Sequence, residues 1–297
     1  MTFIKHHFVS LFLLWMLVFP VLAIGNDPDE VPFGDNPNTG HYASINGIEM
    51  YYEIYGSGAP LLLIHGNGHS IANLHFQIAH FSKDYQVIVG DNRGHGKSGM
   101  GEGQLNYIQM MEDYNALLDK LGVSDAKVFG WSDGGILALL LAIHHPEKVS
   151  KMAVMGANLR PDQTAVYPWV GELLQPLSDM VNEMIGAGDT SDDWQHHRQL
   201  LDLLMTQPGI AIESLHKINI PVLVVASDKD IIRTRHSMEI FENLPKAHMA
   251  VLPGQTHWAP ATDPAGFNAL LEKFFATPYS RPTSEAVLTA ELNPPES

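Results

Sequence analysis

A serine between two glycines is the first feature of the chain that is suited to nucleophilic chemistry. The run Gly-Trp-Ser-Asp-Gly at residues 130–134 lies where a buried apolar run gives way to a helical pattern. In such a strand–turn–helix the central residue adopts a strained backbone conformation, and the residues two before and two after it must be nearly free of side chain. The two glycines meet this condition. Asp133 as nucleophile would place Trp131 at one of those crowded positions, so the pattern predicts Ser132 as the nucleophile.

A serine nucleophile needs a base that is held by an acid, and in a turn of this kind the order along the chain is serine, acid, histidine. The apolar strand 222–226 is followed by the run Ser-Asp-Lys-Asp, and the next strand, 248–252, is followed by a loop that reaches His257. Loops at the carboxyl ends of parallel strands face a common crevice. We therefore predict Asp230 as the acid, with Asp228 as the alternative, and His257 as the base.

A second glycine-rich turn offers backbone donors. The run His-Gly-Asn-Gly at residues 65–68 directly follows the apolar strand 61–64. We predict that the backbone N–H of Asn67 and that of Asp133 form an oxyanion hole, in which each donor is worth roughly 3 kcal/mol in the transition state. For the ring of His65 we expect a structural role, hydrogen-bonded to nearby loop backbone.

These residues require a rigid frame, and the apolar pattern supplies one. Residues 41–46 and 48–55 flank an Asn-Gly turn and predict a hairpin. Short apolar runs without polar alternation, typical of strands buried on both faces, lie at 61–64, 87–89, 128–129, 152–155 and 222–225. Helical patterns lie at 71–81, 107–121, 134–144 and 265–275. Strands alternating with helices predict a doubly wound α/β sheet.

The same pattern gives the domain boundaries. One domain is predicted over residues 41–277. Inside it, residues 160–217 lack a convincing strand but carry helical patterns, which predicts a helical cap inserted over the sheet. Residues 24–40, with three prolines, are typical of a linker, and residues 278–297, with four prolines, are typical of a disordered tail.

The N-terminus has the pattern of a secretory signal. Lys5 precedes an apolar run over residues 8–23, and polar and acidic residues follow at once. Small residues near position 23 suit a cleavage site, so we predict a signal peptide over residues 1–23 and an exported, periplasmic or secreted protein. The alternative is an uncleaved membrane anchor, although a span needs about 20 apolar residues and Pro20 interrupts this run.

Composition limits the partners. The chain has 17 Lys and Arg against 33 Asp and Glu, a net charge of −16, and this balance repels phosphate backbones and argues against a nucleic-acid partner. Hydrophobic residues at 45% and charged residues at 17% are typical of a folded globular chain. Because there is no Cys, disulfides, thiolate metal sites and a Cys nucleophile are excluded. The oligomeric state is left open.

Two further patterns resemble cofactor sites but fit them poorly. The Gly-Lys-Ser run at 96–98 ends like a phosphate-binding loop, yet the residue five before its glycine is Asp91, where that loop needs another glycine. Residues 192–197 carry two Asp and two His with a spacing suited to a metal, which a solvated cap helix explains more simply. We predict neither a cofactor nor a metal.

In their order along the chain, these motifs resemble the α/β-hydrolase superfamily of serine hydrolases. The resemblance covers residues 41–277 and rests on the turn at 65–68, the run Asp-Asn-Arg-Gly-His-Gly-Lys-Ser-Gly at 91–99, the serine turn, the loop at Asp230, and Gly-Gln-Thr-His at 254–257. It implies the α/β-hydrolase fold, with a mostly parallel eight-stranded sheet, an N-terminal hairpin and a helical cap.

A narrower similarity involves the biphenyl-hydrolase-like (valacyclovirase) group. Residues 130–136, 151–152 and 156–158 carry it. Members of that group cleave esters of α-amino acids and use the Asp after the nucleophile to hold the substrate ammonium, which implies a substrate-binding role for the Asp133 side chain. The cap shows no such match, so the substrate is left open.

The sequence therefore predicts an exported serine hydrolase that cleaves a small carboxylic ester through an acyl-enzyme, with an α-amino acid ester as one candidate. Three alternatives use the same triad: a C–C bond hydrolase, a proline iminopeptidase and an enol-lactonase. Fold alone does not choose among them. An alternative of another class is a non-catalytic ligand-binding protein on the same scaffold. The expected partner is a small-molecule ester.

Overall fold

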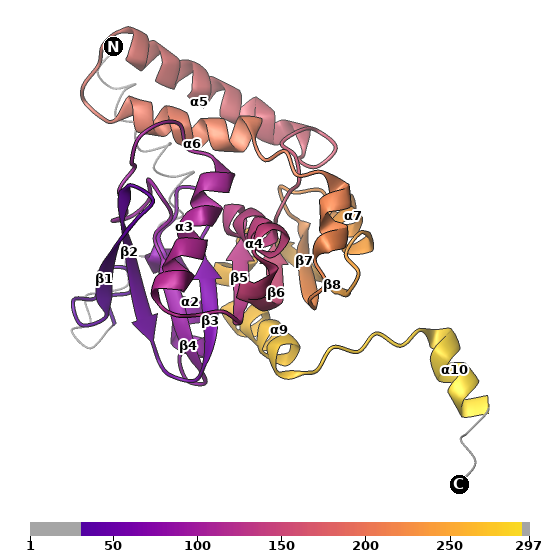
Figure 1. The fold of residues 1–297 in the computed structure, drawn as a ribbon. Helices are drawn as coiled ribbons and strands as arrows, with labels where there is room; N and C mark the ends of the chain where they lie inside the picture. The colour runs from indigo at the N-terminus through magenta and orange to yellow at the C-terminus, as the bar shows by residue number, and fades with distance from the viewer. Residues whose placement is uncertain (1–30, 293–297) are drawn as a thin grey trace.

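The computed structural model of the chain describes residues 31–292, and an eight-stranded sheet forms its centre (Figure 1). The strand order is β1-β2-β4-β3-β5-β6-β7-β8, in which the pairs of β2 with β1 and with β4 are antiparallel and the other pairs are parallel. The strands are β1 Gly40–Ile45, β2 Ile48–Tyr55, β3 Ala59–Ile64, β4 Tyr85–Gly90, β5 Ala126–Trp131, β6 Val149–Met155, β7 Val222–Lys229 and β8 Ala247–Thr256. The predicted hairpin and parallel sheet are confirmed.

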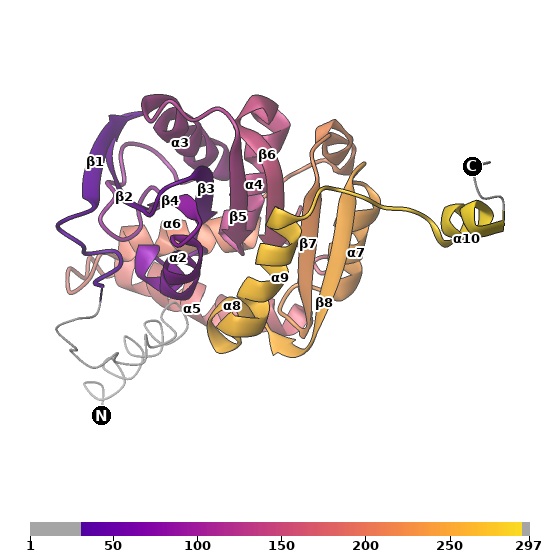
Figure 2. The same ribbon diagram turned by 90° about the horizontal axis from the view of Figure 1, so that it is seen from below.

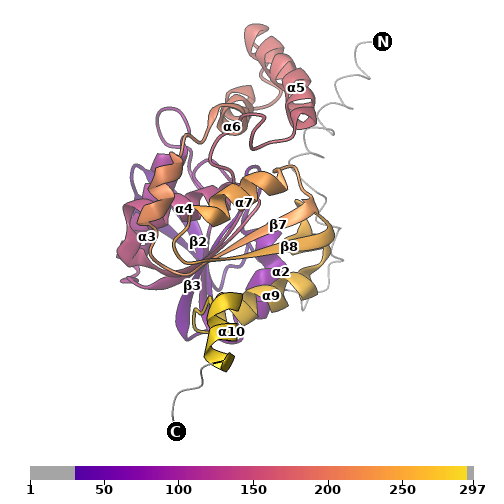
Figure 3. The ribbon, with the colours of Figure 1, turned by 90° about the vertical axis from the view of Figure 1, so that its right-hand side faces the viewer.

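Helices cover both faces of this sheet. The α-helices are α2 His75–Phe81, α3 Tyr107–Lys120, α4 Asp133–His144, α5 Pro168–Gly186, α6 Trp194–Thr206, α7 Thr234–Glu242, α8 Ala259–Thr262, α9 Pro264–Ala276 and α10 Ser284–Leu292. Short 3-10 helices span Ile71–Leu74, Pro146–Lys148 and Ile212–Lys217. One core cluster joins the strands to α3, α4 and α7, and the other joins them to α2, α8 and α9 (Figures 2 and 3).

Strand β3 shows why the apolar runs lack alternation. Leu62 and Ile64 face the cluster with α3 and α4, whereas Leu61 and Leu63 face the cluster with α2 and α9. All four side chains are fully buried, and each contributes roughly 1.5–3 kcal/mol relative to an exposed position. A strand covered on both faces has no position for a polar side chain.

The parallel strands bring several loops to one edge of the sheet. Strands β3, β5, β6, β7 and β8 run in the same direction and are paired in register. Their carboxyl ends therefore lie at a common edge. The predicted nucleophile, acid and base all follow these ends, as does the glycine-rich turn at residues 65–68.

Helices α5 and α6 form a cap over this edge, as Figures 1 and 3 show. They pack on each other through Leu177, Val181, Trp194 and Leu201. They lie within the segment 160–217 in which the sequence predicts a helical cap.

The predicted linker differs from the structure. Glu53 of β2 is fully buried, and its carboxylate accepts backbone N–H bonds from Gly34 at 2.8 Å and from Asn36 at 3.0 Å. The hydroxyl groups of two tyrosines on the same strand donate to it as well. A buried carboxylate needs such donors, so the described part of the predicted 24–40 linker is tied to the domain.

The predicted disordered tail 278–297 also differs, because it contains α10, which stands apart from the domain in Figure 2. The segment is rich in Ala, Leu and Glu, which favour helix, and the Thr283 hydroxyl accepts the Ala286 N–H at 3.0 Å near the helix start. The predicted signal peptide, residues 1–23, lies outside the described residues. No helix within 31–292 combines the length and the apolar character needed to cross a membrane.

Candidate active site

Ser132 occupies a sharp turn between β5 and α4. Its φ of 58° and ψ of −120° fall in a region that residues other than glycine rarely adopt. A Cβ at position 130 would overlap the carbonyl oxygen of residue 134, and one at position 134 would overlap that of Ile64. Both positions therefore require glycine in the structure, which is the condition on which the prediction of Ser132 as nucleophile rests.

Ser132, His257 and Asp230 form a chain of hydrogen bonds. The Nε2 of His257 lies 2.8 Å from Ser132 Oγ, and its Nδ1 lies 2.6 Å from Asp230 Oδ1. Because a carboxylate accepts, the proton lies on Nδ1 and Nε2 is left to accept the serine proton. His257 and Asp230 are 5% and 4% exposed. This arrangement can activate Ser132 as a nucleophile.

The alternative acid lies elsewhere. Asp228 is exposed, and its Oδ1 accepts the backbone N–H of Gly254 at 2.9 Å. The structure thus brings Asp230 and not Asp228 to the histidine.

Neighbouring groups hold the histidine and the acid in place. The indole N–H of Trp131 donates to the His257 carbonyl oxygen at 2.8 Å, and the Ile232 N–H donates to Asp230 Oδ1 at 3.2 Å. Gly156, at the end of β6, has a φ of +64°, and a Cβ there would lie 2.6 Å from His257 Cε1. Sequence reasoning missed the contact of Gly156 with His257. The available signal was a glycine at the end of a parallel strand.

The predicted oxyanion donors belong to two residues in contact. Asn67 Nδ2 donates to Asp133 Oδ2 at 3.1 Å, which joins the turn after β3 to the start of α4. The N–H of Asp133 is the first of a helix and has no acceptor inside it. Among the described residues, neither this N–H nor that of Asn67 donates to another protein group. Two free donors thus lie near the nucleophile.

Comparison with known proteins agrees with this fold. The alpha/beta hydrolase fold family matches residues 59–173, a segment that holds Asn67 and Ser132 but not Asp230 or His257. Among curated proteins, the chain is 27% identical to a putative carbamate hydrolase RutD from Azorhizobium caulinodans, over 78% of this chain and 97% of that one. It is 26% identical to 3-oxoadipate enol-lactonase 2 from Acinetobacter baylyi, over 76% and 92%.

Solved structures resemble this chain over a similar share of its length. The enol-lactonase from Burkholderia xenovorans superposes with a TM-score of 0.66 at 21% identity, over 80% of this chain and all of that one. Est816, described as an N-acyl homoserine lactone degrading enzyme, gives 0.67 at 24% identity, over 79% of this chain and all of that one. The chain belongs to the α/β-hydrolase superfamily. It is a hydrolase, whereas the narrower similarity to the valacyclovirase group stays a prediction.

In this hydrolase the Asp133 carboxylate is enclosed. Asp133 is 2% exposed, and it accepts hydrogen bonds from Asn67 Nδ2 and from the Tyr107 hydroxyl. Burial raises its pKa to about 6, and these two donors oppose the rise. A carboxylate that is covered and already hydrogen-bonded gives no support to the predicted role as partner of a substrate ammonium.

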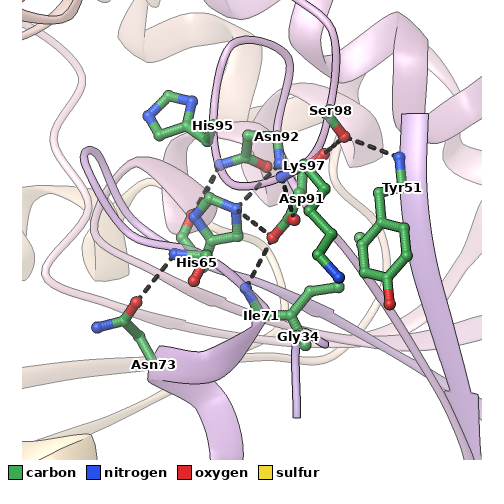
Figure 4. Close-up of polar contacts among 12 residues, drawn as sticks. Gly34, Tyr51, His65, Ile71, Asn73, Asp91, Asn92, His95, Lys97 and Ser98 are labelled. Carbon is green, nitrogen blue, oxygen red and sulfur yellow. Dashed lines mark hydrogen bonds and ion pairs between the residues drawn. The ribbon is translucent and has the colours of Figure 1, made fainter. Parts of the chain in front are cut away.

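His65 serves the loops beneath the site (Figure 4). Its Nε2 accepts the Asn92 N–H at 2.9 Å, so its proton lies on Nδ1, which donates to the Gly66 carbonyl oxygen at 2.8 Å. Burial holds the pKa of the ring well below its usual range. Asp91 accepts the Ile71 and Lys97 N–H groups at 2.8 Å each. This geometry matches the structural role expected for His65.

The acidic and histidine residues of 192–197 tie the cap together. Asp193 accepts the His196 N–H at 3.0 Å at the start of α6, and His196 Nε2 donates to the Gly94 carbonyl oxygen at 2.6 Å. His197 Nε2 lies 3.2 Å from Asp192 Oδ2. Within residues 31–292, no three His, Asp or Glu side chains come together as metal ligands.

A cavity of about 330 Å³ lies between the cap and the loops after β3 and β4. Helix α6 contributes His196 and Leu200 to its wall, and the loop after β3 contributes Gly68 and His69. The His69 ring also packs on Trp131, at 4.8 Å between centroids. The cavity therefore adjoins the loop after β3 that carries Asn67, while Ser132, Asp230 and His257 are not among the residues that line it.

Proposed function

We propose that this hydrolase is a serine hydrolase that cleaves a small carboxylic ester. Ser132 Oγ attacks the ester carbonyl carbon while its proton passes to His257 Nε2, and the alcohol leaves with that proton as the C–O bond breaks. Water then repeats the sequence on the acyl-enzyme, releasing the acid and restoring Ser132. Asp230 orients the ring, and the N–H groups of Asn67 and Asp133 hold the oxyanion.

One observation carries this proposal: the Ser132 hydroxyl lies 2.8 Å from His257 Nε2 on a glycine-flanked turn. The names of three relatives specify a carbamate or a lactone, and a lactone is a cyclic ester. Two others are named 2-hydroxymuconate semialdehyde hydrolase and meta-cleavage product hydrolase, so the names alone do not choose the bond. We take lactone hydrolysis by the same steps as the second candidate. The enclosed Asp133 carboxylate gives no reason to favour an α-amino acid ester.

The first test addresses the nucleophile. A fluorophosphonate probe should label the wild-type chain at Ser132. Ser132→Ala and His257→Ala should each lower kcat on the order of 10⁶-fold, because members of a triad act as a unit. Asp230→Asn should cost less, and Asp228→Asn, as the matched carboxylate control, should leave kcat near the wild-type value.

Three outcomes would contradict parts of this proposal. A folded wild-type chain that resists the probe would favour the non-catalytic ligand-binding alternative. A larger loss for Asp228→Asn than for Asp230→Asn would reverse the assignment of the acid. A panel of p-nitrophenyl esters, aminoacyl esters, lactones and ring-cleavage products then ranks the bond types by kcat/KM, and a highest value on C–C substrates would replace ester hydrolysis.

A further inference from the structure

The Asn67 side chain touches both the nucleophile helix and the cap. Its Nδ2 donates to Asp133 Oδ2 at 3.1 Å and to the Leu200 carbonyl oxygen of α6 at 3.2 Å. Asp133 and Leu200 are 2% and 5% exposed, and Asn67 is partly buried between them. The amide has two N–H donors, and both are engaged.

Both bonds come from the side chain of Asn67, whose backbone N–H is one of the two predicted oxyanion donors. The two residues whose side chains are joined, Asn67 and Asp133, are the same two whose backbone N–H groups point to no other protein acceptor. A change in the position of the Asn67 amide therefore changes the spacing of the two donors. Because the donors act on charge that develops in the transition state, their spacing affects the rate more than the binding of the ester.

The bond to Leu200 connects this hole to the cavity. Leu200 lines one wall of the cavity, and Gly68, next to Asn67, lines the other. A molecule in the cavity would contact both α6 and the loop after β3, and the Asn67 amide joins the same two elements. Other bonds from α6, such as Gln199 Oε1 accepting the Leu105 N–H at 2.8 Å, fix the cap without contacting either oxyanion donor.

We propose that Asn67 is a positioning residue that couples the cap to the oxyanion hole. This inference rests on the proposed serine mechanism and adds to it a task for the Asn67 side chain, separate from that of its backbone N–H. The position of the cap then affects the chemical step as well as access to the site.

The test compares two side-chain deletions. Asn67→Ala keeps both backbone donors and the three residues of the triad but removes both amide bonds. We expect kcat for a p-nitrophenyl ester to fall roughly 10- to 100-fold, less than the 10²- to 10³-fold loss of a donor itself, with KM changed less than about 3-fold. The rate of fluorophosphonate labelling should fall in proportion. Gln199→Ala, the matched control, removes a cap bond away from the hole and should leave both rates near wild type.

A double-mutant cycle separates positioning from folding. Asp133→Ala also keeps its N–H and removes the same Asn67 contact, so its loss and that of Asn67→Ala should be non-additive in kcat. The isosteric Asn67→Asp, which has no amide donors, serves if the alanine variant does not fold. Wild-type rates in folded Asn67→Ala, or equal losses in Gln199→Ala, would overturn the coupling. A wild-type chain that resists the probe would instead contradict the serine mechanism.

Discussion

Ser132 combines a reactive position with an unfavourable backbone conformation. A non-glycine residue at positive φ costs on the order of 1–3 kcal/mol, and here the cost is offset by local contacts. The Ser132 N–H donates to the Met155 carbonyl oxygen at 2.7 Å, and its carbonyl oxygen accepts the N–H groups of Gly135 and Ile136. The turn is thus held from β6 and from inside α4, which keeps Oγ at the carboxyl edge of the sheet.

The carboxyl group of Asp133 gives a prediction for how the stability of the protein depends on pH. Its pKa rises from 3.8 to about 6 on folding because the carboxyl group is buried. The folded state then binds the proton more tightly than the unfolded state, so this residue's contribution to the free energy of unfolding decreases as pH rises from about 4 to about 6. The total loss is about 3 kcal/mol. Asp133→Asn cannot titrate and should lack this decrease.

Urea unfolding of the wild type and Asp133→Asn at several pH values between 4 and 7 measures the difference. Asp91, whose pKa is also raised to about 6, is present in both proteins, so its effect cancels. The variant should gain stability relative to the wild type as pH rises. Parallel pH profiles would contradict the assigned pKa.

At the scale of elements, β6 contributes a position without a side chain. At Gly156, a Cβ would lie 2.6 Å from His257 Cε1 and 2.8 Å from its Nδ1, so Gly156→Ala must displace the ring. We expect a loss in kcat of roughly 10²-fold, as for a displacement of about 1 Å in a catalytic group. Measurements of kcat and of Tm on purified variants check this.

Gly188→Ala is the matched control for that variant. Its φ of +66° is close to the +64° of Gly156, and a Cβ there meets nothing within 4 Å. Both variants therefore pay the same backbone cost of about 1–2 kcal/mol, but only Gly156→Ala should lose activity. Equal activity in the two would show that the His257 ring tolerates the added methyl group.

The elements also show what a single sequence predicts well. Strands such as β3 were predictable because burial on both faces leaves an uninterrupted apolar run, and the serine turn was predictable because its glycines are a steric necessity. Helix α7 was missed, since it has only nine residues and few buried side chains. The attachment of residues 31–39 to Glu53 was missed because it depends on a contact between distant parts of the chain that leaves no local pattern.

For the whole molecule, the sequence predicts the positions of the candidate catalytic residues better than it predicts the substrate. The site comes from loops at one sheet edge, which topology fixes. The cavity depends on how α6 lies over those loops through bonds such as Asn67 to Leu200, which join residues 133 positions apart. Such packing follows from tertiary structure and not from local periodicity, so the substrate class needs the experiments above.

Export is the last property that concerns the whole molecule, and we propose that residues 1–23 are removed on secretion. Edman sequencing of the protein from a secreting bacterial host should begin at or near Ile24. In the matched variant Leu14→Arg, the apolar run carries a charge. A central Arg costs about 2.5–3.5 kcal/mol on insertion scales, so uncleaved chain should accumulate inside the cell. Both a signal peptide and a membrane anchor need the apolar run, but only the signal peptide is cleaved. Full-length wild-type chain in the membrane pellet would therefore favour the anchor.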